Sequence, residues 1–117
     1  MDDNAILIKS KAFAIRTVKL YQYLTANKKE YILSKQILRS GTSIGANVKE
    51  AQYGQSKRDF VHKMRIALKE ASETEYWLEL LFETGYIESK HYDSLYKDCN
   101  EILRLLNSIV QSSSDGL

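Results

Sequence analysis

The sequence predicts an all-α protein, an antiparallel up-down-up-down four-helix bundle, from three observations. Apolar residues recur at spacings of three and four along four long segments, and no segment shows sustained alternation of apolar and polar residues. The 117 residues include no proline and only five glycines, so few positions can interrupt a helix. The segments are joined by connections of about three to five residues, and connections this short make neighbouring helices antiparallel.

The first predicted helix extends from about residue 4 to residue 26. Its expected apolar face consists of Phe13, Ala14, Thr17, Val18, Tyr21 and Leu24. The second predicted helix extends from about residue 32 to residue 53, and its thinner face consists of Leu33, Ile37, Ser40, Ile44, Val48 and Ala51. Inside this helix, Gly41 and Gly45 each cost about 1 kcal/mol relative to alanine. We therefore expect another helix to approach the backbone closely at these two glycines.

The third predicted helix begins after Ser56 and reaches Thr84. Ser56 and Asp59 form a variant of the capping box, and Gly85 suits the C-cap. The apolar face of this helix is predicted to consist of Phe60, Met64, Ala67, Ala71, Thr74, Leu78 and Leu81. The fourth predicted helix extends from about residue 89 to residue 111, and its apolar face consists of Tyr92, Leu95, Cys99, Ile102, Leu106 and Ile109.

Residues 1–111 are expected to form a single domain, and residues 112–117 a flexible C-terminal tail. The apolar content of 44% excludes a disordered chain, and the lack of a run of about 18 apolar residues excludes a membrane-spanning protein. The acidic first residues precede an apolar run that is too short for a secretory signal, and Cys99 is the single cysteine. These features predict a cytoplasmic protein without an intrachain disulfide.

Few residues could support catalysis or bind a metal. His62 lies on the charged face of the third predicted helix, and His91 lies near the start of the fourth. Cys99 falls on an apolar face, where a buried structural thiol is expected rather than a nucleophile. Neither a P-loop nor a dinucleotide-binding fingerprint is present. We therefore expect a protein that is not an enzyme, with no catalytic residue, no metal site and no cofactor.

The charged residues are distributed unevenly along the chain. Residues 1–65 carry 13 Lys and Arg against 5 Asp and Glu, a charge of +8. Residues 66–117 carry 4 against 10, a charge of −6, so that the two parts sum to the net charge of +2. Two interpretations remain open: basic and acidic helices lie side by side in the fold or across subunits, or a basic face binds nucleic acid.

A basic stripe lies near the start of the third predicted helix. It consists of Arg58, His62, Arg65 and Lys69, and it is joined by Lys57 and Lys63. Cations in the first turn oppose the helix dipole, so they do not stabilise the helix locally. Either they form a solvated face that pairs with acidic groups elsewhere, or they bind phosphate. Under the second interpretation, the nucleic-acid-binding residues are Lys57, Arg58, Arg65 and Lys69.

A polar stripe follows one face of the second predicted helix. Its members are spaced by four, four and three residues and are Arg39, Ser43, Asn47 and Glu50. Arg39 and Glu50 are too far apart to pair on the helix, so each must contact another helix, water or a neighbouring subunit. The stripe is interpreted either as plain surface or as a structural or interface network that fixes helix register or subunit contacts.

Several apolar and aromatic residues exceed what one bundle core needs. The chain has eight tyrosines, which either stack bases beside neighbouring lysines or form an oligomer interface. Trp77, Leu80 and Thr84 form a second apolar edge on the third predicted helix. A helix that is apolar on two sides needs a further surface to bury, most simply a second copy of the same chain. The sequence therefore predicts a homo-oligomer.

The run SKQILRSGTSIGANVKE, from Ser34 to Glu50, resembles the central motif of a known family. The resemblance continues into the third helix through Ser56, Asp59, Phe60, Ile66, Ala67, Glu73, Glu75, Gly85 and Tyr86. This family is the bacterial four-helix-bundle family named after the 23S rRNA intervening-sequence protein. The chain departs from the family pattern at Ala51, where glycine is frequent, and at Lys69-Glu70, where Gly-Ser is frequent.

The resemblance implies an antiparallel bundle that assembles into a homo-oligomer, a pentameric ring in similar proteins. Founding members are encoded within insertions in large-subunit rRNA genes, and a distant relative is an accessory protein that binds nucleic acid and a reverse transcriptase. We therefore expect a non-enzymatic oligomer that associates with RNA, or with DNA, through its basic helix face. The alternative is a protein-interaction scaffold that docks a partner enzyme, such as a reverse transcriptase accessory protein. No membrane partner is expected.

Overall fold

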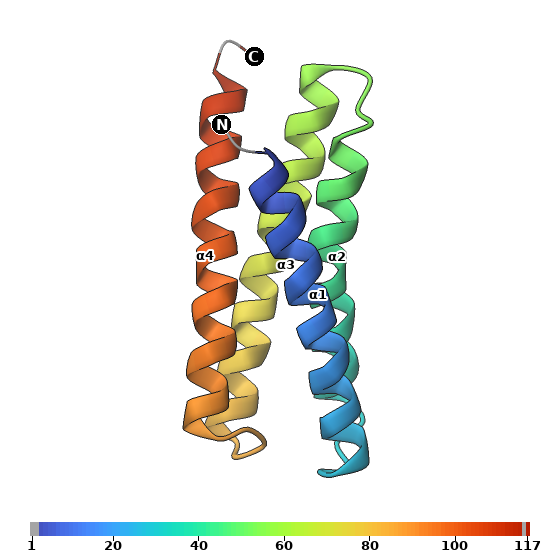
Figure 1. Ribbon diagram of the computed structural model, residues 1–117, viewed down its shortest axis with the longest axis vertical. Coiled ribbons are helices and arrows are strands. Elements are labelled where there is room, and N and C mark those ends of the chain that lie inside the picture. Colours follow the sequence, from blue (N-terminus) through green and yellow to red (C-terminus); the bar gives the residue numbers. More distant parts are fainter. Residues whose placement is uncertain (1–2, 116) are drawn as a thin grey trace.

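The computed structural model describes residues 3–115 and 117, and these residues form a four-helix bundle without strands. The helices are α1 (Asp3–Ala26), α2 (Leu33–Ala51), α3 (Lys57–Glu83) and α4 (Ser89–Ser114). Successive helices run antiparallel in a body of 47 × 21 × 19 Å (Figure 1), so the predicted up-down-up-down fold class is confirmed. α4 continues three residues past the predicted end of the domain, and residue 116 of the expected tail lies outside the described part. No helix in the described ranges is long and apolar enough to cross a membrane.

Helix α2 packs between α1 and α3, and α3 packs against α4, whereas α1 contacts α4 much less extensively. Two ion pairs bridge this weaker seam: Lys9 Nζ lies 3.3 Å from Glu101 Oε1, and Arg16 Nη1 lies 2.7 Å from Asp98 Oδ2. Both pairs are partly exposed, so each contributes at most about 1 kcal/mol. They show that basic residues of α1 lie beside acidic residues of α4 within one chain.

The core faces predicted for α2, α3 and α4 are largely confirmed, since most of their residues are buried. The face predicted for α1 is partly wrong. Its buried residues are Ile6, Ser10, Phe13, Thr17, Leu20 and Leu24, whereas Val18 is exposed and Tyr21 is half-buried. Ile8 and Ile15 are also exposed on α1. Because α1 is apolar on two sides, its spacing alone did not single out the side that faces the core.

The two glycines of α2 lie where α1 crosses it. A Cβ atom built on Gly41 would overlap the Thr17 methyl group, and one built on Gly45 would lie 3.3 Å from the Ser10 carbonyl oxygen. The predicted close approach of another helix is therefore confirmed. It brings the backbones of α1 and α2 together at two successive turns.

The termini of α3 have the predicted caps. Ser56 Oγ accepts a hydrogen bond of 3.1 Å from the Asp59 N–H. Gly85 adopts a φ of 85°, and the N–H groups of Gly85 and Tyr86 donate to the Phe82 and Leu81 carbonyls. These two bonds form a Schellman motif, which ends the helix and turns the chain toward α4.

Candidate nucleic-acid interface

The predicted basic stripe lies on the first half of α3, at one end of the bundle. The connection between α2 and α3 and the C-terminal end of α4 lie at the same end (Figure 1). The Ser56 cap fixes where α3 begins and therefore where the stripe starts. Arg58, His62 and Arg65 are spaced by four and three residues, which places them on one side of the helix.

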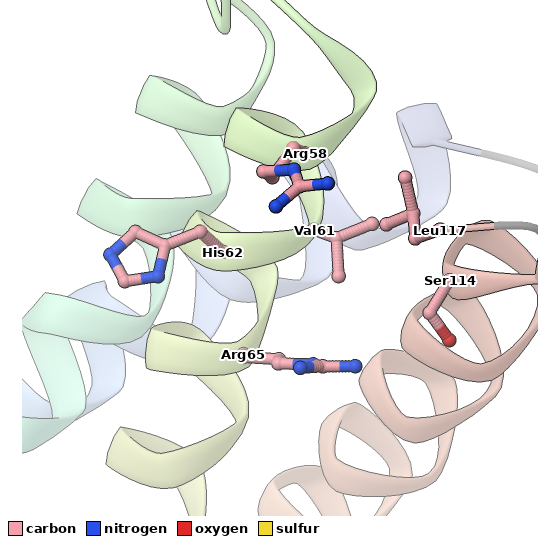
Figure 2. A pocket seen from close by; sticks show the side chains of 6 residues that line it. All are labelled: Arg58, Val61, His62, Arg65, Ser114 and Leu117. Carbon is pink, nitrogen blue, oxygen red and sulfur yellow. The ribbon is translucent and has the colours of Figure 1, made fainter.

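These three side chains line a surface cavity of about 420 Å³ between the ends of α3 and α4. The lining residues are Arg58, Val61, His62, Arg65, Ser114 and Leu117, none of which has an acidic side chain. Figure 2 shows Arg58 and Arg65 on either side of Val61, with Ser114 on the α4 side. His62 points the other way, toward α2.

The cavity is suited to an anion because its arginines are not neutralised. Arg58 and Arg65 are both exposed, and neither forms an ion pair within residues 3–115 and 117. A guanidinium presents five N–H donors in a fork that matches two oxygens of a phosphate. Two such forks beside one cavity therefore form a site at which a phosphate group can be bound.

The structure does not bring every predicted basic residue to this cavity. Lys57 Nζ donates to the Asp115 carbonyl oxygen at 3.2 Å and so connects the ends of α3 and α4. Lys63 Nζ pairs with Glu50 Oε1 at 2.8 Å. Lys69 is exposed on α3 but does not line the cavity. The site is therefore more compact than the predicted stripe.

A second cavity, of about 360 Å³, adjoins the first. Its lining residues are Glu50, Tyr53, Gly54, Gln55, Asp59, His62 and Lys63. His62 belongs to the walls of both cavities. Tyr53 was not among the residues predicted from the sequence. The signal that could have identified it is an aromatic residue beside the Gly54 helix break, five positions before Arg58.

The polar stripe of α2 faces the seam with α3. Arg39 Nη2 lies 2.8 Å from Glu73 Oε2, and the same oxygen accepts a hydrogen bond of 3.1 Å from Trp77 Nε1. At the other end of the stripe Glu50 pairs with Lys63, as described above. Between them, Asn47 Nδ2 donates to the Ser43 carbonyl oxygen at 2.9 Å. Arg39 and Glu50 thus find their partners on a neighbouring helix of the same chain.

The single thiol is remote from solvent. Cys99 is fully buried in α4, and its Sγ donates to the Ala71 carbonyl oxygen at 3.4 Å. Burial, together with the charges of Glu75 and Asp98, raises the pKa of Cys99 to about 12. The thiol is therefore protonated at neutral pH and packs as a structural side chain, as expected from the sequence.

Comparisons with known proteins agree with this architecture. Residues 2–108 match the family model described as 23S rRNA-intervening sequence protein. Among solved structures, the chain is similar to a protein of unknown function from the S23 ribosomal protein family of Bacteroides thetaiotaomicron. The two share 56% sequence identity over 95% of this chain and 99% of that chain, with a TM-score of 0.93. A search of curated proteins finds no match, and neither matching description names an enzymatic activity. Because the match spans nearly the whole bundle, the chain belongs to the 23S rRNA-intervening sequence protein family.

Proposed function

We propose that this chain is a non-enzymatic, homo-oligomeric protein that binds RNA through the basic end of α3. The observation that carries the proposal is the cavity that Arg58 and Arg65 line without an acidic side chain. Arginines that have no carboxylate partner are free to pair with phosphate. The family's association with 23S rRNA intervening sequences makes RNA the first nucleic acid to test.

Contacts of this kind recognise the backbone and not the bases. Phosphate binding by a few cations gives an affinity that falls steeply with salt concentration and varies little with sequence. The net charge of +2 is modest, so the interaction depends on where the cations lie and not on their total number. We therefore assign the RNA contact to one end of the bundle.

The exposed apolar residues of α1 support the oligomer. Three large apolar side chains of this helix are exposed to solvent: Ile8 by 70%, Ile15 by 49% and Val18 by 38%. The edge predicted on α3 is less available, because Trp77 and Leu80 are half-buried. We therefore propose that a second copy of the chain covers this apolar surface of α1. The resemblance to pentameric relatives gives five subunits as the number to test.

The RNA proposal is tested by reversing charge inside and outside the cavity. The variant Arg58→Glu/Arg65→Glu should lose most binding to a structured RNA at low salt. In any binding that remains, the slope of log K against log salt should be shallower by about two. The control Lys97→Glu/Arg104→Glu changes the net charge equally at exposed positions of α4 outside the cavity, and it should bind nearly as the parent does.

Equal losses in the two double variants would contradict the assignment to this cavity. Absence of RNA binding by the parent at low salt would contradict the proposed function itself. The solution mass of each variant should match that of the parent, because none of these four side chains is buried.

A protein-interaction scaffold is the second candidate, and the seam between α3 and α4 favours it. Glu79 and Glu83 form no ion pair within the described ranges, and they lie near Tyr92. Burial, followed by the charge of Glu79, raises the pKa of Tyr92. An acidic, aromatic surface of this kind fits a partner protein that carries Lys or Arg. This candidate takes precedence if the parent protein binds no RNA.

A further inference from the structure

The two cavities at the basic end of the bundle differ in chemistry. The first presents Arg58 and Arg65, whereas the second presents the ring of Tyr53 together with amide and carboxylate groups. His62 separates them and contributes to both walls. A cationic cavity beside an aromatic one is the arrangement that a nucleotide requires, because its phosphate is anionic and its base is flat and aromatic.

Tyr53 is positioned to act as a stacking platform. Its side chain is 78% exposed, but its backbone is fixed by the hydrogen bond from Tyr53 N–H to the Glu50 carbonyl oxygen at 3.0 Å. Gly54 then lets the connection press against α3, since a Cβ there would lie 3.1 Å from the backbone nitrogen of Phe60. The fold thus holds an exposed aromatic ring at the wall that His62 shares with the arginine cavity.

The polar lining of the second cavity suits the edge of a base better than a second phosphate. Glu50 is neutralised by Lys63, whereas Asp59 and Gln55 offer acceptors, and Gln55 also offers donors. A carboxylate repels phosphate but accepts hydrogen bonds from the amino and imino groups of bases. The charge pattern therefore separates a place for phosphate from a place for base.

We propose that Tyr53 stacks on an unpaired RNA base whose neighbouring phosphate occupies the cavity of Arg58 and Arg65. This inference rests on the proposed RNA-binding function and specifies its ligand as single-stranded RNA. In an A-form duplex the bases are stacked within the helix and are not free to lie on a protein ring. A duplex can still contact the arginines through its backbone, but it does not use Tyr53.

The inference is tested with two probes, a short oligouridine and an RNA duplex of the same length. The variant Tyr53→Ala should bind the single strand at least about fivefold more weakly, since base stacking on an aromatic ring is worth about 1–3 kcal/mol. Its affinity for the duplex should stay within about twofold of the parent. The variant Tyr53→Phe retains the ring, and it should bind both probes as the parent does.

The matched control is Tyr76→Ala, which removes another exposed tyrosine on α3 outside both cavities. It should change neither affinity. A 2-aminopurine base in the single strand gives a direct signal, because stacking quenches its fluorescence. The parent and Tyr53→Phe should quench it, and Tyr53→Ala should not.

The outcomes separate this inference from the function on which it rests. Loss of binding in Arg58→Glu/Arg65→Glu, with unchanged binding and quenching in Tyr53→Ala, overturns the stacking site but leaves the RNA function in place. Equal losses for the duplex and the single strand in Tyr53→Ala also overturn it. If the parent binds neither probe at low salt, both the function and the inference are wrong.

Discussion

Glu30 caps α2 in a way that side-chain spacing did not predict. Glu30 is 8% exposed, and its carboxylate accepts hydrogen bonds from the N–H groups of Ile32, Leu33 and Ser34 at 3.2, 3.0 and 2.7 Å. Lys29 adopts a φ of 54°, which turns the chain so that this longer acid reaches the helix start. Burial alone would raise the pKa of Glu30, but the three N–H groups outweigh it and hold the pKa below its ordinary value of 4.5.

Replacing this carboxylate should destabilise the fold in a pH-dependent way. Because the folded-state pKa is lowered, the carboxylate contributes stability above pH 4.5 and loses it as the pH falls through the folded-state pKa. Glu30→Gln should lower the free energy of unfolding by about 1.5–3 kcal/mol near neutral pH, measured by urea titration. The difference from the parent should shrink in acid.

Glu88→Gln is the control for Glu30, because Glu88 occupies the N-cap position of α4 without a side-chain cap bond. It should leave the unfolding free energy nearly unchanged. An equal loss in both variants, or a Glu30→Gln loss that does not vary with pH, would show that the hydrogen-bonded carboxylate is not the cause.

At the scale of elements, the sequence predicted most of the fold. In α2, α3 and α4 the buried residues fall mainly on the faces that spacing predicted. Helix α1 has two apolar faces, and only the arrangement of its neighbours decides which one faces the core.

The basic cavity was partly predictable, because Arg58 and Arg65 share a face by spacing. Ser114 joins this cavity, and Tyr53 lines the adjoining second cavity, through tertiary packing, which spacing along one helix does not encode.

The close contact between α1 and α2 lets us predict how a substitution at Gly41 changes stability. In Gly41→Ala the new methyl group overlaps Thr17, and such overpacking destabilises the fold by about 1–3 kcal/mol. The higher helix propensity of alanine offsets about 1 kcal/mol of this loss. We expect a net loss of stability in thermal or urea unfolding. Thr17→Ala removes the overlapping methyl, so the Gly41→Ala/Thr17→Ala double variant should recover part of the loss in a double-mutant cycle. Additive effects of the two substitutions would contradict direct contact.

For the molecule as a whole, the basic cavity and the exposed apolar residues of α1 lie on different elements of the bundle. The basic cavity lies at the end where α3 begins, whereas the apolar residues Ile8 and Ile15 lie along the outer side of α1. These surfaces share no residue, so assembly and RNA binding can be separated by substitution. Neither the oligomer surface nor the RNA-binding cavity could be located from the net charge of +2, because this value sums over a basic and an acidic part of the chain.

The exposed side of α1 gives the prediction for assembly. Ile8→Lys/Ile15→Lys places two charges on a surface that would lose water in an oligomer, and uncompensated burial of charge opposes association. Light scattering should find the parent at a multiple of 13.5 kDa and the variant at or near 13.5 kDa, with helical content retained. Tyr76→Lys, at an exposed position of α3, should keep the mass of the parent. A monomeric parent would refute the oligomer, and an unchanged mass in Ile8→Lys/Ile15→Lys would show that the interface is not on α1.

The same variant tests whether assembly strengthens RNA binding. Because RNA contacts made by several copies add through high effective concentration, the monomeric variant should bind a long RNA more weakly than the parent. It should bind a short oligouridine with an affinity per chain similar to that of the parent.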